Sequence, residues 1–178
     1  MQFNRAKFKA MVHYVCRKMA TDSKSLGATK LHKVLWFSDG YNYTRRGVPM
    51  SGEKYIKHDY GPFSTHLAEV VHELEGEHKL RTGESQHYGK TKKDFIGVGV
   101  VDTSSLTERE LRILDENIDS ICYGHTANSI SEKSHDEIWE MAYQFEQIPY
   151  EALIAKFIKP TDEDIEWAKS EIARISQG

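Results

Sequence analysis

Histidines next to carboxylates are the residues of this chain that could hold a metal ion. The stretch His72–Gly76 begins like the His-Glu-x-x-His helix motif of zinc proteases, but Gly76 stands where the second histidine is needed. His66 and Glu69 lie one helical turn apart, as do Glu69 and His72, and either pair could touch a metal. Such pairs are common on exposed helix surfaces, and the chain has no Cys-x-x-Cys pair for a structural zinc site. We therefore expect neither a metal nor another cofactor.

Nucleophilic catalysis is equally poorly supported. Cys16 and Cys122 stand among apolar residues of expected helices, where a thiol is inert, and a disulfide between them is the minor alternative. Ser134, His135 and Asp136 have the residue types of a catalytic triad, but adjacent residues cannot adopt the relay geometry. The sequence therefore predicts that the protein is not an enzyme.

A helix boundary is the better interpretation of this Ser-His pair. Ser134 is expected at the N-cap, with Glu137 three positions later closing a capping box. His135 is expected to tie this boundary to a buried helix, and contact with a partner is the alternative. Trp139 is predicted to be a core residue rather than a binding hot spot.

The segment from His58 to Pro62 could carry a binding function. Strand alternation places Ile56, His58 and Tyr60 on one face, and Gly61-Pro62 then turns the chain. The turn could simply redirect the backbone, or it could present a rigid ridge to a partner. If it does bind a partner, the expected contacts are His58, Asp59, Tyr60 and Phe63.

Three lysines, Lys90, Lys92 and Lys93, gather at the tip of an expected β-hairpin. A basic tip beside an aromatic residue could enter a nucleic-acid groove. The whole chain carries a formal net charge of −3, however, so it does not attract nucleic acid overall. The sequence therefore does not favour nucleic-acid binding, which is kept as an alternative.

The composition is that of an ordinary soluble domain: 178 residues, 39% hydrophobic and 29% charged. No linker or repeat divides it, so residues 1–178 are expected to form one domain. No apolar run follows the start, and no stretch approaches the roughly 18 apolar residues that span a bilayer. These features predict a cytoplasmic protein without membrane contact.

Hydrophobic periodicity predicts a mainly helical α+β fold. A first helix with an inner stripe from Phe8 to Met19 is followed by an aromatic, central helix over about Thr29–Arg46 that Gly47 ends. A strand over Glu53–Tyr60 is expected to stop at Pro62. A third helix, capped by Ser64 or Thr65, should bury its stripe of apolar residues, namely Leu67, Val70, Val71 and Leu74.

The remaining elements are a hairpin and further helices. The hairpin is expected over Leu80–Tyr88 and Lys93–Val101, with Ile96, Val98 and Val100 facing the protein and Gly97 and Gly99 facing away. Thr107 and Glu110 form a capping box for a fourth helix, which should face inward with Leu111, Leu114, Ile118 and Ile121 and end at Gly124. A short helix over Thr126–Ser134 and a turn or two over His135–Phe145 come next. A last helix, capped at Pro160–Glu163, should face inward with Ile165, Ala168, Ile172 and Ile175.

Three blocks in this order resemble the Panacea domain, the SocA-like antitoxin family. They are the Lys-Leu-x-Lys helix with Lys30, Leu31 and Tyr41, the Tyr-Gly-Pro turn with Gly61 and Pro62, and the Ser-His pair followed by Trp139. The resemblance covers roughly Met11 to Leu153. Phe63 departs from it, because a valine is common at that position.

The resemblance implies an antitoxin of a toxin–antitoxin system, of a kind also found in phages and prophages. Its partner would be a cognate protein toxin, commonly a translation inhibitor encoded by an adjacent gene, and it would act by direct binding or by delivery to a protease. A nucleic-acid-binding regulator and a metal-dependent enzyme remain the alternatives.

Overall fold

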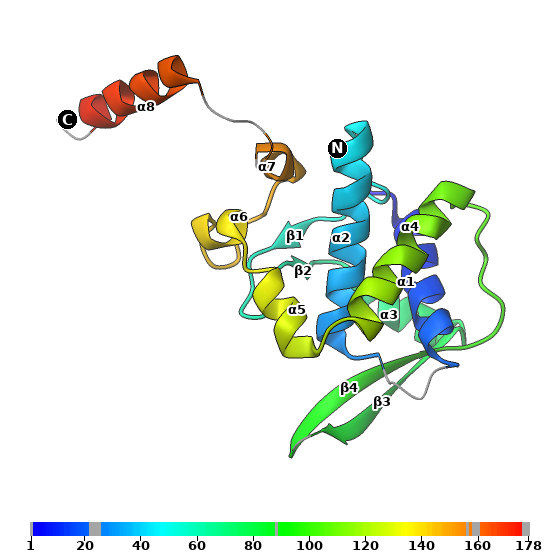
Figure 1. Ribbon diagram of the computed structural model, residues 1–178. Helices are drawn as coiled ribbons and strands as arrows, with labels where there is room; N and C mark the ends of the chain where they lie inside the picture. Colours follow the sequence, from blue (N-terminus) through cyan, green and yellow to red (C-terminus); the bar gives the residue numbers. More distant parts are fainter. Residues whose placement is uncertain (1, 22–25, 88, 156, 158–160, 176–178) are drawn as a thin grey trace.

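A computed structural model of the chain describes residues 2–21, 26–87, 89–155, 157 and 161–175. The fold in this part of the chain is mainly helical with two small, two-stranded antiparallel sheets (Figure 1). This confirms the α+β class. Tyr88 and Pro160, named above in the hairpin and in the last helix cap, lie outside the described residues.

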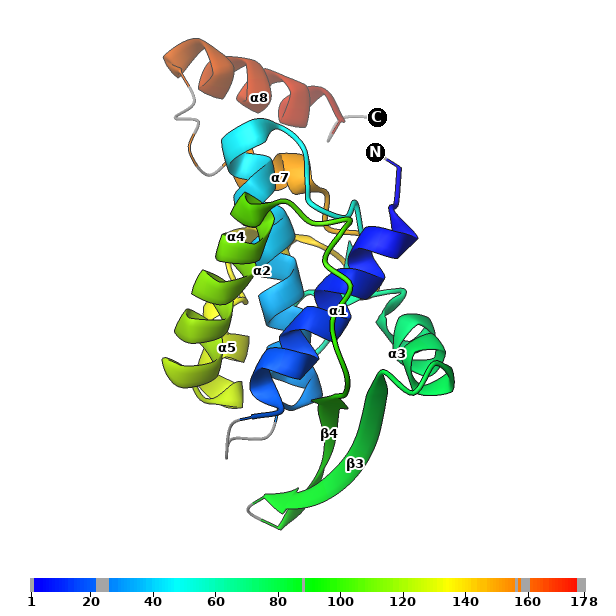
Figure 2. The ribbon, with the colours of Figure 1, turned by 90° about the vertical axis from the view of Figure 1, so that its right-hand side faces the viewer.

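Helix α2 (Ala28–Arg46) is the centre of the core. It buries residues around most of its circumference, including Leu31, Val34, Leu35 and Trp36, as expected for a central helix. Helices α1 (Arg5–Met19), α4 (Glu108–Ile118), α5 (Ala127–Lys133) and α7 (Tyr150–Ala155) pack around it (Figure 2). Gly47 ends α2 in the left-handed conformation with φ 73°, as predicted.

Helices α1 and α4 follow the predicted patterns. The expected inner stripe of α1 is buried throughout: Phe8, Met11, Val12, Val15 and Met19. Thr107 and Glu110 form the predicted capping box of α4. Ile113 is buried on α4 in addition to Leu114 and Ile118, whereas Leu111 is only partly buried. The helix continues as a five-residue π-helical turn, η1 (Asp119–Tyr123), which buries Ile121 and ends at Gly124.

The segment around Pro62 forms a tight loop between two short strands. Strand β1 (Tyr55–Ile56) pairs with β2 (Phe63–Ser64), so the predicted strand over Glu53–Tyr60 is too long. The chain turns at His58, because the Gly61 amide donates a 2.8 Å hydrogen bond to the His58 carbonyl. Pro62 therefore lies inside this loop, and strand pairing resumes after it.

Helix α3 (Leu67–Gly76) buries the predicted stripe, but its N-terminus differs. His66 is its N-cap residue, and neither Ser64 nor Thr65 caps it. Thr65 instead donates its amide and its hydroxyl to the Glu53 carboxylate, at 2.9 and 3.0 Å. The loop before the helix is thus bound to a buried acid rather than to the helix itself.

The hairpin packs with the face opposite to the predicted one. Strands β3 (Leu80–His87) and β4 (Lys90–Gly97) pair in register from Leu80↔Gly97 to His87↔Lys90, and the hairpin projects away from the helices (Figures 1 and 2). Phe95 is buried, whereas Ile96 is 45% and Val100 92% exposed. A Cβ atom on Gly97 would lie 2.3 Å from the Arg17 amide nitrogen, so the glycine faces α1 and allows the two backbones to approach.

The C-terminal helices contribute less to the core than predicted. Helix α6 (Glu137–Met141) has no buried residue, and α8 (Asp162–Ile175) has none among its described side chains. Three of the four predicted inner residues of α8 are exposed, Ile165 by 39%, Ile172 by 66% and Ile175 by 72%, and Ala168 is half-buried. Helix α8 stands apart from the other helices in Figure 1. Its apolar stripe is therefore not a core stripe.

A buried acid in α2 anchors the chain before β1. Asp39 is fully buried and accepts hydrogen bonds from the Ser51 amide at 2.7 Å, the Ser51 hydroxyl at 2.6 Å and the Tyr55 hydroxyl at 2.9 Å. Burial raises the pKa of Asp39 to about 6, although these donors act in the opposite direction. The Tyr150 hydroxyl adds a 2.7 Å bond to the Glu53 carbonyl. This network sets the start of the loop that leads to Gly61.

Both cysteines are buried in the core as thiols, as expected. Burial raises the pKa of the Cys16 thiol far above its ordinary value, so this group stays protonated and unreactive. Across the described ranges, no helix combines the length and apolar character that crossing a bilayer requires.

Candidate functional site

Three segments that are distant in the sequence meet at Gly61. A Cβ atom on this residue would lie 2.2 Å from the Ser134 Oγ and 2.6 Å from the Lys33 Nζ, and its φ is +94°. Only glycine combines this backbone conformation with so close an approach. The helix block, the Tyr-Gly-Pro turn and the Ser-His pair are therefore parts of one site, with the residues of α2 at its floor.

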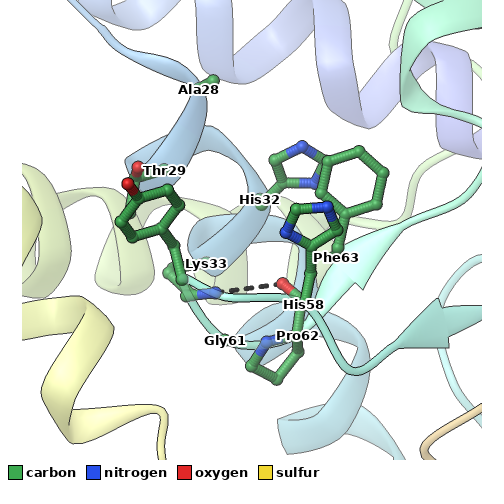
Figure 3. A pocket seen from close by; sticks show the side chains of 9 residues that line it. Ala28, Thr29, His32, Lys33, His58, Gly61, Pro62 and Phe63 are labelled. Atoms are coloured by element: carbon green, nitrogen blue, oxygen red, sulfur yellow. Dashed lines mark hydrogen bonds between the residues drawn. The ribbon is translucent and has the colours of Figure 1, made fainter. Parts of the chain in front are cut away.

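Lys33 is the unusual residue of this site, because its charge is buried. The side chain is 1% exposed, and its Nζ donates a 3.0 Å hydrogen bond to the Pro62 carbonyl (Figure 3). Burial lowers the pKa of Lys33 to about 7, since water no longer solvates the ammonium. Burial therefore brings the titration of this amine from the alkaline range down towards neutral pH.

His32, Phe63 and His58 form a row of stacked rings beside Lys33. The Phe63 ring lies 4.1 Å from the His32 ring and 5.0 Å from the His58 ring, measured between centroids. His32 Nδ1 accepts a 3.1 Å hydrogen bond from the Ser64 amide, and burial followed by the charge on Lys33 lowers its pKa to about 3. His32 is therefore a neutral acceptor, and it fixes β2 to α2.

The predicted contact residues differ in their exposure. Asp59 is exposed and Tyr60 is 66% exposed, so both can meet a partner. His58 and Phe63 are less exposed, because both are half-buried and each packs against another ring of the row. Of the four predicted contact residues, Asp59 and Tyr60 are therefore exposed, and His58 and Phe63 belong to the row of packed rings.

A cavity of about 110 Å³ opens between the turn and α2 (Figure 3). Lys33, His32 and Thr29 line it from the helix, and His58, Tyr60 and Phe63 line it from the turn. None of the described residues that line it is acidic. The cavity therefore presents a buried amine, a hydroxyl and aromatic rings.

The structure gives the predicted N-cap role of Ser134 to Asp136. Ser134 is the C-cap of α5, and its hydroxyl donates a 2.7 Å hydrogen bond to the Ser131 carbonyl. Asp136 is the N-cap of α6, with its carboxylate accepting a 3.0 Å bond from the Trp139 amide. The predicted capping box of Ser134 and Glu137 is therefore wrong. The N-cap of the next helix falls two residues later than predicted, at Asp136, because Ser134 still belongs to the end of α5.

Trp139 is only partly buried, which corrects its assignment to the core. His135 stacks on it at 3.8 Å with an interplanar angle of 8° and makes no bond to α2 among the described contacts. The Lys57 ammonium lies 4.2 Å from the Trp139 ring centroid. The indole N–H donates a 3.3 Å hydrogen bond to the His58 carbonyl. Trp139 thus stabilises the turn through contacts on its outer side.

Trp139→Ala is expected to lower the free energy of unfolding by about 1–2 kcal/mol, below the roughly 3–5 kcal/mol typical of a buried Trp. The smaller effect follows from its partial burial. Trp139→Phe, the control, keeps a ring for His135 and Lys57 and should lose less. Chemical denaturation measures both variants, and a loss above about 3 kcal/mol for Trp139→Ala would restore the core assignment.

A second exposed segment lies beside the turn and was missed in the sequence. The Gln144 amide donates a 2.9 Å hydrogen bond to the Asp59 carboxylate, and the Phe145 amide donates to the Lys57 carbonyl at 3.0 Å. Tyr143 is 82% and Phe145 62% exposed, and Phe145 has a φ of 66°. Together with Asp59 and Tyr60, Tyr143 and Phe145 form what we call the turn surface. In the sequence, the aromatic residues after Met141 lack helical spacing, and this pattern could have indicated an exposed binding segment.

The other candidate sites of the sequence have structural explanations. Glu69 and Glu73 both bind Arg5, at 3.1 and 2.5 Å, so they join α3 to α1. His66 Nδ1 lies 3.1 Å from the buried Glu53 carboxylate. Among the residues that the structure describes, no group of three or more His, Cys, Asp or Glu could hold a metal.

The basic hairpin tip is partly engaged within the protein. The Lys92 ammonium pairs with Asp94 at 3.0 Å, and the Lys93 ammonium lies 5.6 Å from the Phe95 ring centroid. These contacts occupy two of the three lysines that were considered for nucleic acid. They leave the turn surface as the better candidate for binding.

Comparison with known families agrees with the blocks that meet at Gly61. The family model described as antitoxin SocA-like, Panacea domain, matches residues 31–140. This protein belongs to the SocA-like Panacea family. The matched region contains Lys33, Gly61, Ser134 and Trp139, so the predicted resemblance is confirmed. No curated protein and no solved structure matches the chain.

Proposed function

We propose that this protein is an antitoxin that neutralises a cognate protein toxin by direct contact. The family match carries the proposal, because it spans all three segments of the site around Gly61. We place the toxin in an adjacent gene and expect it to inhibit translation. The setting is the cytoplasm, with phage defence as the biological role. Delivery of the toxin to a protease is the alternative to neutralisation by contact alone.

The turn surface suits contact with a protein. Tyr60, Tyr143 and Phe145 expose large aromatic side chains, and aromatic residues supply much of the energy of interfaces. The backbone beneath them is held by the Gly61–His58 bond and by the bonds between residues 57–59 and 144–146. A backbone already held in place loses little entropy on binding. Binding of this kind requires no covalent change in the toxin.

Tyr60→Ala and Asp59→Arg should each weaken binding of the toxin by about tenfold or more and reduce rescue of growth. Both residues are exposed, so the melting temperature should stay within a few degrees of the parent. The measurement is growth after co-expression with the product of the adjacent gene, together with affinity by calorimetry and intact mass of the toxin.

Val100→Ala is the matched control, because Val100 is 92% exposed and lies beyond the end of β4. It should rescue growth like the parent. Full rescue by both turn variants would place the contact surface elsewhere, with the hairpin as the next candidate. A change in the intact mass of the toxin would contradict neutralisation by contact alone.

A further inference from the structure

The cavity behind the turn surface has the chemistry of a receptor for one anionic group. Its floor carries the Lys33 amine, which has three N–H donors when protonated and makes one hydrogen bond among the described residues, to the Pro62 carbonyl. A buried ammonium without a counter-charge is costly. An anion that entered the cavity would remove that cost.

The surroundings of Lys33 favour an anion over a cation or a neutral group. No described lining residue is acidic. Burial, followed by the charge on Lys33, lowers the pKa of both His32 and His135. The charged side chain that lines the cavity is therefore the cation Lys33, which attracts an anion. Asp59, the acid of the turn, is bound by Gln144 on the outer surface.

The size and the second donor select a carboxylate. A volume of about 110 Å³ accepts a small planar group. Thr29 stands one helical turn before Lys33, so the two side chains share a face of α2, and both line the cavity. The hydroxyl of Thr29 and the amine of Lys33 can each donate to one carboxylate oxygen. The rings of His58 and Phe63 would then pack on the methylene groups that carry the carboxylate.

We propose that this cavity binds the carboxylate of a Glu or Asp side chain of the toxin. This inference rests on the proposed function, and it adds a specific polar anchor to the aromatic contacts of the turn surface. The cavity is lined by Tyr60, which also belongs to that surface, so one bound partner can reach both. Opposite charges matched across an interface fix which partner binds and in which register.

The first test uses the protein alone with sodium acetate as the probe. NMR of the Lys33 ¹³Cε and of the histidine rings is recorded at pH 6, where the Lys33 amine is mostly protonated, with sodium chloride at equal ionic strength as the control. Acetate should raise the pKa of Lys33 and shift the His32, His58 and His135 signals in a saturable way. Thr29→Val should weaken acetate binding several-fold. Equal effects of acetate and chloride would overturn the proposal.

The second test measures toxin affinity for Lys33→Met and Thr29→Val. Both should weaken the complex, Lys33→Met by about tenfold or more. Circular dichroism and melting confirm folding, and Thr29→Val decides the outcome if Lys33→Met does not fold. A parent complex whose affinity neither variant changes overturns the carboxylate anchor and leaves the proposed function intact. A parent protein that forms no complex and rescues no growth overturns the proposed function itself.

Discussion

Replacing Asp39 by alanine is expected to lower the free energy of unfolding by about 3–5 kcal/mol. Asp39 is fully buried in α2 and accepts three hydrogen bonds, two from Ser51 and one from Tyr55. Alanine would leave these donors unpaired in the core and open a small cavity. Urea or guanidinium denaturation of the purified variant measures the loss. A loss below about 1 kcal/mol would show that water or a rearranged side chain satisfies the donors.

Asp39→Asn is the matched control and also tests the charge. The folded-state pKa of Asp39 is raised to about 6, so between its ordinary value near 4 and pH 6 the folded protein keeps a proton that the unfolded chain has lost. This group therefore contributes stability that is present at low pH and is lost as pH rises through about 6. Asparagine does not titrate. The difference in stability between the parent and Asp39→Asn should shift in favour of Asn over this window.

Local patterns were sufficient to predict the helical framework. The stripe of α1, the capping box at Thr107 and the glycine that ends α2 each depend on residues within a few positions of one another. Such local preferences exist before distant elements pack together, and they are retained in the folded protein. The aromatic character of α2 also indicated its central position correctly, because only a helix covered on all sides can bury so many large residues.

Errors arose where packing of distant elements decides which face is buried. Alternation over residues 96–100 favoured Ile96 and Val100 as inner residues, but α1 approaches the side that carries Phe95 and Gly97. The hydrophobic pattern could not show that a backbone contact with Arg17 requires glycine there. The stripe of α8 was similarly assigned to a core that it does not reach. The expectation that residues 1–178 form one domain stays a prediction.

The candidate site was only partly visible in the sequence. The turn from His58 to Pro62 was identified, as were Ser134 and Trp139, but nothing in their local sequence places them together. Their meeting point is set by Gly61, and its role depends on two side chains 28 and 73 positions away. The burial of Lys33 is not predicted, because a lysine in a helix usually points to solvent. Its burial could have been predicted from its position on a helix that buries most of its circumference.

Gly61→Ala is expected to destabilise the protein by about 2–4 kcal/mol and to abolish rescue of growth. The new methyl group would overlap the Ser134 hydroxyl and the Lys33 amine, and the backbone at φ +94° strains any residue that carries a Cβ. Relief requires the turn to move away from α2 and α5. That movement would open the cavity and displace Tyr60 from the turn surface.

Gly76→Ala separates this effect from the general effect of losing a glycine. Gly76 is the last residue of α3, and a Cβ there meets nothing within 4 Å, so alanine should be neutral or stabilise by a few tenths of a kcal/mol. Thermal melting, denaturation and growth rescue are measured for both variants. If Gly61→Ala melts and rescues like Gly76→Ala, the three segments are not tightly coupled at Gly61. If it folds stably and still fails to rescue, the position of the turn matters to toxin binding more than to folding. In that case the close contact of Gly61 with Lys33 and Ser134 would be required for function. The glycine would be needed because it lets the turn sit where the partner binds.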